Sequence, residues 1–235
     1  NKVHALEGMI GFNQENATYK GVGLSRNNLI ANDIPFLNLA TGDRSTSDYM
    51  NQWAIRGAFF RLFYAYDDKY LFQVNGRYDG SSRFPKNDRF AFFPTFSLGW
   101  RLSQEKFWKP ISHIVNDFKI RGSYGALGNQ VLNQGGYAAY YPYISTYSTG
   151  EVGYLFNGEK QMGVYSPGLV SDQLTWETVK QWDLGFNFSM LDSRLTGEFD
   201  YYVRTTEDML TKSKTLPSIL GVSEPQMNAA DLRTK

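Results

Sequence analysis

Two histidines, His4 and His113, are the side chains best suited to act as a general base or to hold a metal near neutral pH. They lie far apart in the sequence, and neither has a carboxylate at the spacing of a histidine triad or a metal cluster. Cysteine is absent, which removes thiolate nucleophiles, Cys-based zinc sites and disulfides. The sequence therefore predicts neither a catalytic nor a metal role for the histidines, and no cofactor.

Other possible chemistry is equally poorly supported. Glu198 and Asp200 share one face of a predicted strand, whereas a glycosidase needs two carboxyls that converge across a bond. Gly21-Val22-Gly23 lacks the third glycine and the strand-helix context of a dinucleotide site. The 24 basic residues are balanced by 23 acidic ones, so no excess charge favours nucleic acid. We expect no enzyme and no nucleic-acid partner.

The elements that must position any binding side chains are β-strands. Aromatic residues make up 16% of the chain, which favours β-sheet. From 69 to 79 apolar and polar residues alternate with the period of two that indicates a strand. The same alternation recurs over 94–103, 118–124, 181–190 and 194–204, and more weakly over 3–12, 52–66 and 137–143. The pattern predicts an all-β, antiparallel chain of about eight strands.

The predicted connections alternate in length. Asp67-Asp68 and Asp192-Ser193 are tight links, and 104–116 is a compact one in which Phe107, Trp108, Ile111 and Ile114 predict a short amphipathic turn. Long polar links are predicted over 13–50, 80–90, 126–174 and from 205 onward. Short turns at one end and long extracellular loops at the other are typical of transmembrane β-barrels. Two aromatic girdles are then expected, one with Tyr66, Tyr70 and Trp100 and one with Trp53, Tyr78, Trp182 and Tyr201.

Alternation alone leaves other interpretations open. In a soluble β-rich carbohydrate-binding module the apolar face would be a core rather than a lipid contact. A secreted glycan-active enzyme is a third, weaker hypothesis. Gly, Ser, Asn and charged residues on the polar faces suit a wet lumen, and loops this long are uncommon in compact domains. The discriminating feature is where the apolar face points.

A polar segment follows the strand that ends near residue 79. Asp79 is expected to accept hydrogen bonds from nearby backbone amides and to pair with Arg83, while Gly80 is expected to supply a positive φ. Such residues order a loop more often than they catalyse a reaction. The predicted loop-ordering motif is Asp79, Gly80, Ser81, Ser82 and Arg83.

The loop over 126–174 is rich in tyrosine. Rings in a water-exposed loop pack on each other, pack on the rim of the sheet, or contact a ligand or partner. We predict a ligand-contact or partner-contact loop that contains Tyr137, Tyr140, Tyr141, Tyr143, Tyr147 and Tyr154.

Ordered motifs carry a resemblance to a known family. Arg77-Tyr78-Asp79-Gly80-Ser81-Ser82-Arg83-Phe84 resembles a signature of the SusC/RagA-type TonB-dependent receptors. The resemblance continues in register through residue 210, with motifs at Trp100-Arg101-Leu102-Ser103, 119–130, Trp176-Glu177 and Asp200-Tyr201-Tyr202. It is strongest over 77–210, and it departs from the family pattern at Phe118 and at Trp182-Asp183.

The resemblance implies a location and a set of partners. Residues 1–235 would form a partial barrel domain of a Bacteroidetes-like outer membrane, cut at both ends, without the plug domain or terminal strand of these barrels of about 22 strands. Its implied function is nutrient import, with an oligosaccharide or oligopeptide as the solute. The implied partners are a surface-exposed SusD-like lipoprotein, TonB acting through the plug, and outer-membrane lipid.

Overall fold

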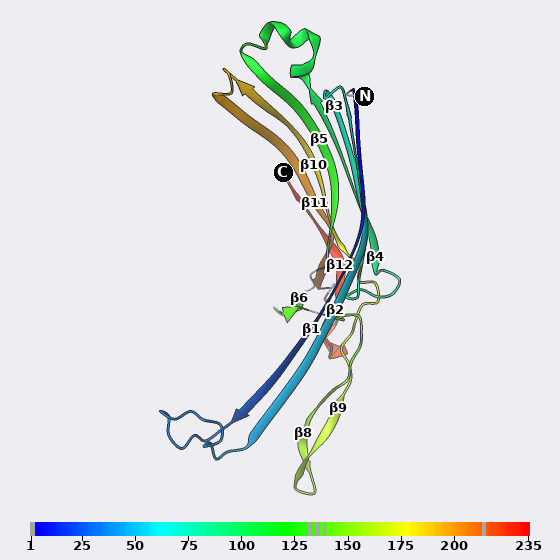
Figure 1. The fold of residues 1–235 in the computed structure, drawn as a ribbon. Coiled ribbons are helices and arrows are strands. Elements are labelled where there is room, and N and C mark those ends of the chain that lie inside the picture. Colours follow the sequence, from blue (N-terminus) through cyan, green and yellow to red (C-terminus); the bar gives the residue numbers. More distant parts are fainter. Residues whose placement is uncertain (1–2, 131–132, 135–136, 139, 213–214) are drawn as a thin grey trace.

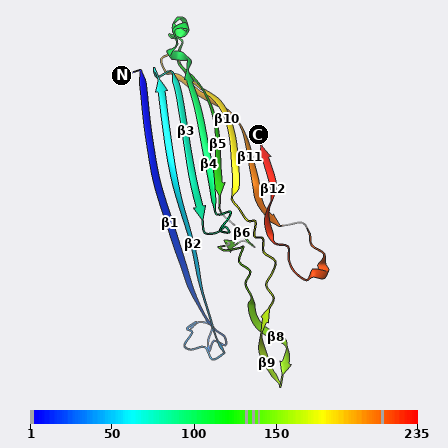
Figure 2. The same ribbon diagram turned by 90° about the vertical axis from the view of Figure 1, so that its right-hand side faces the viewer.

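One curved antiparallel sheet dominates the molecule (Figure 1). The computed structural model describes residues 3–130, 133–134, 137–138, 140–212 and 215–235, with the backbone alone described at 133–134 and 137–138. Within these ranges the eight strands of the sheet run in the order β1-β2-β3-β4-β5-β10-β11-β12, and neighbours pair antiparallel (Figure 2). Their bounds are β1 His4–Arg26, β2 Arg44–Tyr66, β3 Tyr70–Ser81, β4 Phe90–Arg101, β5 Val115–Asn129, β10 Glu177–Met190, β11 Leu195–Lys212 and β12 Gln226–Thr234.

The remaining elements are short. They are two small antiparallel pairs, β6 Asn133–Gln134 with β7 Tyr137–Ala138 and β8 Ser148–Phe156 with β9 Glu159–Tyr165, and three 3-10 helices, η1 Leu102–Gln104, η2 Lys106–Ile111 and η3 Ser218–Leu220. No helix in the described part of the chain is long and apolar enough to cross a membrane.

Tight turns close one end of the sheet, as the sequence predicts. Asp67 and Asp68 both have positive φ, and Lys69 N donates to Tyr66 O at 2.9 Å, so the β2–β3 link is a two-residue hairpin turn. Leu191, Asp192 and Ser193 make a similar left-handed link between β10 and β11. The connections at the other end are longer, and the β1–β2 and β8–β9 hairpins project beyond the sheet there (Figure 1).

Three predicted boundaries are wrong. The loop expected over 13–50 is mostly strand, because β1 and β2 stay in register as far as the pair Arg26 and Arg44. The strand expected over 137–143 is a two-residue strand followed by a turn, and the eighth strand of the sheet is β12, inside a region expected to be loop from 205 onward. In each case backbone pairing, rather than an apolar face, determines whether the segment is a strand.

The sheet has an apolar face and a polar face. The apolar face is continuous across neighbouring strands, because residues of the same kind lie opposite one another: Tyr64, Phe72 and Leu98 in β2–β4, and Phe186 and Phe199 in β10 and β11. It remains exposed, with Ile10 at 88%, Trp182 at 64% and Leu184 at 60%. The polar face bears Gln73, Asn75, Arg77, Ser97, Lys119, Arg121, Asp183, Asn187, Glu198 and Asp200.

The girdle prediction needs one correction. Tyr66, Tyr70 and Trp100 lie together near the tight-turn end of the apolar face, where the Tyr70 ring stacks on Trp100 and lies tilted against Tyr66. Trp53, however, lies on the polar face, and its ring is covered by the guanidinium of Arg83 at 5.4 Å. Side chains alternate between the two faces along β2, and the even-numbered positions lie on the apolar face. Residue 53 is odd-numbered, so its side chain lies on the polar face.

Candidate functional site

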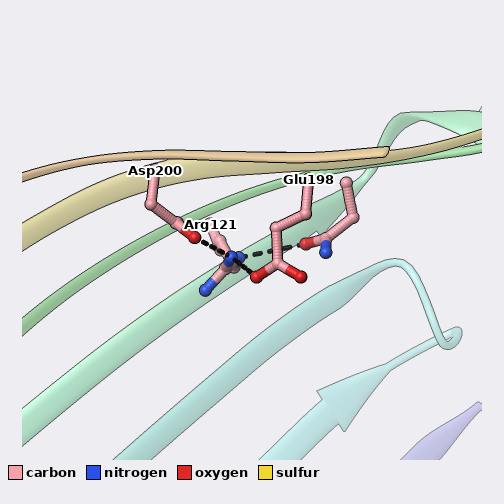
Figure 3. Close-up of polar contacts among 4 residues, drawn as sticks. Arg121, Glu198 and Asp200 are labelled. Carbon is pink, nitrogen blue, oxygen red and sulfur yellow. Dashed lines mark hydrogen bonds and ion pairs between the residues drawn. The ribbon is translucent and has the colours of Figure 1, made fainter. Parts of the chain in front are cut away.

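The polar face carries a compact charged cluster on β5, β10 and β11 (Figure 3). The Arg121 guanidinium donates to Asn187 Oδ1 at 3.0 Å and to Asp200 Oδ2 at 2.7 Å, and it also pairs with Glu198. Gly185 makes room for this arrangement, because a Cβ at that position would overlap the Asp200 carboxylate. Two carboxylates share one cation, so the cluster offers polar atoms to a ligand without forming a pair of catalytic acids.

A shallow hollow lies beside this cluster. It has a volume of about 320 Å³ and is lined on this face by two apolar residues, Phe63 and Leu71, and by Gln73, Ser97, Gly99, Lys119, Arg121 and Asp183. Its polar side chains provide both hydrogen-bond donors and acceptors, and both signs of charge. The polar face can therefore contact a polar solute or a polar protein segment.

The predicted loop-ordering motif lies at the long-loop end of the sheet and is largely buried. Asp79 pairs with Arg77 through two hydrogen bonds, Nε to Oδ2 and Nη2 to Oδ1, both 3.1 Å. The expected pair with Arg83 is wrong, because the Arg83 guanidinium lies over the rings of Trp53 and Tyr140. The alternation over 69–79 places Arg77 and Asp79 on the same face of the strand, and this was the sequence signal that favoured Arg77.

The expected role of Gly80 is also wrong. Gly80 is not among the described residues with positive φ, and it continues β3 in register opposite Phe90. A Cβ at Gly80 would overlap the Phe90 ring, so this glycine provides space rather than conformational freedom. The close packing of a ring over a strand glycine is a recurring feature of β-sheets.

Ser81 and Ser82 connect the motif to neighbouring strands. Ser82 N donates to Ala54 O, and Ala54 N donates to Ser82 Oγ, both at 2.9 Å, so this residue extends the pairing with β2. Ser81 Oγ accepts from Arg83 N at 3.3 Å, and the Ser81 side chain is fully buried. These contacts give a physical basis for the proposal that the motif orders the β3–β4 loop.

A buried hydrophobic cluster holds this loop against the segment before β10. It consists of Phe84, Phe93, Leu174 and Trp176. Trp176 contacts the rings of Phe84 and Phe93 at centroid distances of 5.1 and 5.5 Å, and its Nε1 donates to Arg89 O at 3.0 Å. Leu174 and Trp176 were not among the sequence-predicted site residues, although an isolated Trp and Leu in a polar segment before a strand are a usable signal of a buried anchor.

The loop tyrosines separate into two groups. Tyr140 packs under Arg83 and against Tyr19, and Tyr143 donates to Ser82 O at 3.5 Å, so both rings are built into the rim of the sheet. The side chain of Tyr137 lies outside the described residues.

The second group is exposed. Tyr147 and Tyr154 are 72% and 62% exposed. Tyr141 lines a hollow of about 340 Å³, together with Tyr140 of the first group and with Pro142, Ile144, Thr146, Gly168, Leu169 and Val170. The Tyr141 ring also lies edge-on against Tyr143, and the Tyr154 ring lies against Phe156. All three rings keep exposed surface that can contact a ligand or partner.

Within the described ranges no group of histidine and acidic side chains could hold a metal ion. His4 Nδ1 lies 2.9 Å from Tyr64 Oη at the tight-turn end, far from the tyrosine loop. The structure instead provides polar and aromatic surfaces for contact with a ligand or partner: the Arg121 cluster with its hollow, and the exposed tyrosines.

Comparison with known proteins gives one consistent result. The family model described as TonB dependent receptor-like, beta-barrel matches residues 4–235. The chain is 34% identical over 235 residues to TonB-dependent receptor P3 of Formosa agariphila, and 34% identical over 171 residues to TonB-dependent receptor SusC of Bacteroides thetaiotaomicron. These matches cover 99% and 73% of this chain, but only 22% and 17% of those receptors.

A solved structure of the RagAB peptide transporter shares the fold. It aligns with a TM-score of 0.80 at 24% sequence identity, over 99% of this chain and 25% of that one. The open-open state of the RagAB peptide importer aligns with a TM-score of 0.77 at 25% identity. The chain therefore spans about a sixth to a quarter of the length of the proteins that it matches. It belongs to the TonB-dependent receptor-like β-barrel family.

Proposed function

We propose that the chain is part of the barrel wall of a TonB-dependent outer-membrane nutrient importer of the SusC/RagA type. The observation that carries this proposal is the two-sided sheet, with an exposed apolar face and a face lined by polar and charged side chains. Lipid covers the apolar face, and the polar face lines the lumen. A soluble carbohydrate-binding module is not favoured, because the relatives that match nearly the whole chain are TonB-dependent receptors.

The solute is an oligosaccharide or an oligopeptide. Exposed rings at Tyr141 and Tyr154 offer flat apolar surface to a sugar or a peptide side chain, while the Arg121 cluster and its hollow offer polar contacts below. A SusD-like surface lipoprotein covers the long-loop end, and TonB supplies energy through a plug domain that belongs to the full receptor. The plug, rather than these strands, then couples the wall to the inner membrane.

The orientation of the sheet can be tested by labelling. In the full receptor on whole cells, cysteine at Asn87 should react with a membrane-impermeant thiol reagent, whereas cysteine at Ser193 should not. Both side chains are exposed, but Asn87 lies in the β3–β4 loop and Ser193 lies in a tight turn. Labelling at Ser193 alone would mean that the long loops face the periplasm. Breaking the outer membrane should make both positions react.

The exposed tyrosines should contribute to solute binding. Tyr141→Ala and Tyr154→Ala in the full receptor should each leave barrel folding unchanged and weaken solute binding by about tenfold, the effect of losing one interface ring. Isothermal titration with the solute and the gel shift of heat-modified receptor measure the two quantities. Tyr143→Ala is the matched control, because this ring packs on the buried cluster and should loosen the loop instead. Loss of binding only in proportion to loss of folded receptor would show that the rings are scaffold.

A further inference from the structure

The link between β4 and β5 is the part of the tight-turn end that the importer model leaves without a role. Residues 105–114, called the rim segment here, contain η2 with the sequence Lys-Phe-Trp-Lys-Pro-Ile. The sequence predicts a short amphipathic turn here, and the structure confirms a 3-10 helix. A connection made only to join two strands could be as short as the two-residue turn at Asp67-Asp68.

Hydrogen bonds hold the start of the rim segment on the apolar side of the sheet. Glu105 Oε1 accepts from Tyr70 Oη at 2.7 Å and from Trp100 Nε1 at 3.2 Å. Both donors belong to the apolar face and stack on each other at its edge. The hydrogen bonds from Tyr70 and then Trp100 also lower the pKa of Glu105, so its carboxylate remains ionised and engaged at neutral pH.

Aromatic stacking holds the middle of the segment on the same side. Trp108 stacks on Phe118 with a centroid distance of 5.4 Å, and its Nε1 donates to Val115 O at 3.1 Å. Phe118 stacks in turn on Phe186, and Phe186 stacks on Phe199. The rim segment is therefore continuous with the surface that faces lipid in the proposed importer.

The exposed side chains of the rim segment include apolar residues and lysines, beside Ser112 and His113. Phe107 is 62% exposed, and Ile111 and Ile114 are each 43% exposed. Lys106 and Lys109 are exposed, and neither has an ion-pair partner in the described part of the chain. The segment carries no acid after Glu105, which is already occupied by its two donors. Apolar tips beside unpaired lysines are typical of a surface that lies in the interface of an anionic membrane.

We propose that the rim segment binds anionic glycerophospholipid of the periplasmic leaflet, with Phe107 and Ile111 among the acyl chains and Lys106 and Lys109 on the phosphates. This inference rests on the proposed function, which places the apolar face in the membrane and the tight turns at the periplasm. Its occupant follows from continuity with the lipid-facing surface and from charge complementarity between the lysines and phosphate.

Depth-dependent fluorescence quenching tests the proposal. Single-cysteine versions of the full receptor carry a thiol-linked fluorophore at Phe107, at Leu184 on the apolar face, or at Asp192 in the tight turn of the same rim. The receptors are reconstituted with phospholipids brominated near the headgroup or deep in the acyl chain. We expect deep lipid quenching at 184, shallow lipid quenching at 107, and quenching by aqueous iodide rather than lipid at 192.

The lysines are tested with the reporter at 107. Quenching by brominated anionic phospholipid relative to brominated zwitterionic phospholipid measures the lipid preference at this position. Lys106→Gln and Lys109→Gln should each lower that preference by about fivefold. Lys86→Gln is the matched control, because this exposed lysine lies in the β3–β4 loop at the opposite end of the sheet and should leave the preference unchanged.

The two possible failures have different signatures. If lipid quenches the reporter at 184 but only iodide quenches the reporter at 107, the wall is in the membrane and the rim segment is not, so the proposal is wrong. Protection of 107 from both quenchers would mean that protein covers the segment, which also overturns it. If lipid fails to quench the reporter at 184, the importer model itself is wrong.

Discussion

Arginine at Leu184 should lower the free energy of unfolding of the full receptor in lipid by about 2 to 4 kcal/mol, the cost of this side chain near the midplane of a bilayer. Leu184 lies near the middle of β10, is 60% exposed and belongs to the continuous apolar face. Urea titration of the receptor folded in phospholipid vesicles measures the change.

Two adjacent residues of β3 provide the matched comparison. Phe72 lies on the apolar face and Gln73 on the polar face, beside the hollow next to Arg121. Phe72→Arg should cost nearly as much as Leu184→Arg, whereas Gln73→Arg should cost much less because the new charge stays in water. Equal losses at Phe72 and Gln73 would exclude the barrel and favour a two-sided core.

Trp176→Ala should cause the largest loss of local stability at the long-loop end of the sheet. Removing a buried aromatic ring costs about 3 to 5 kcal/mol, and Trp176 joins Phe84 and Phe93 in the buried cluster that fixes the loops. The loss should appear as local opening of the β3–β4 loop and of the segment before β10, because neither lies within the membrane band. Hydrogen exchange of the intact receptor, followed by mass spectrometry over 82–89 and 170–176, measures the opening of these two segments.

A conservative change separates packing from hydrogen bonding. Trp176→Phe keeps a six-membered ring in the cluster but loses the donor to Arg89 O and part of the ring volume. Opening of the loops should therefore become easier by about 1 to 3 kcal/mol, less than in Trp176→Ala. Exchange in the strands near Leu184 should not change in either variant. Unchanged exchange in the loops of Trp176→Ala would show that the cluster does not hold them.

Side-chain contacts at the loop end were harder to predict than the strands. Asp79 lies two residues from Arg77 and four from Arg83, and both pairings were possible on the sequence. The structure selects Arg77 because the alternation of β3 puts 77 and 79 on the same face, while Arg83 lies beyond the strand end, over the Tyr140 ring. Likewise Trp53 was assigned by its expected depth, although its odd position in β2 determines its face.

The residue pattern alone predicts the fold class, the two faces of the five clearest strands and the tight turns at 67–68 and 192–193, and the motifs over 77–210 predict the family. The strand faces and the turns can be predicted because they depend on consecutive residues. Alternation with a period of two follows from the backbone geometry of a strand, and a short polar link follows from that of a hairpin turn. The folded structure was needed to show how far β1 and β2 extend and that β12 is the eighth strand of the sheet. It was also needed to show that Arg121 contacts Asn187, Glu198 and Asp200 on two other strands. It also decided which tyrosines are anchored, because Tyr140 and Tyr143 meet their partners Arg83 and Ser82 only when a distant loop folds back on the sheet. The physical reason is that such contacts join residues far apart in the chain, so their register depends on pairing across strands and not on the residues beside them.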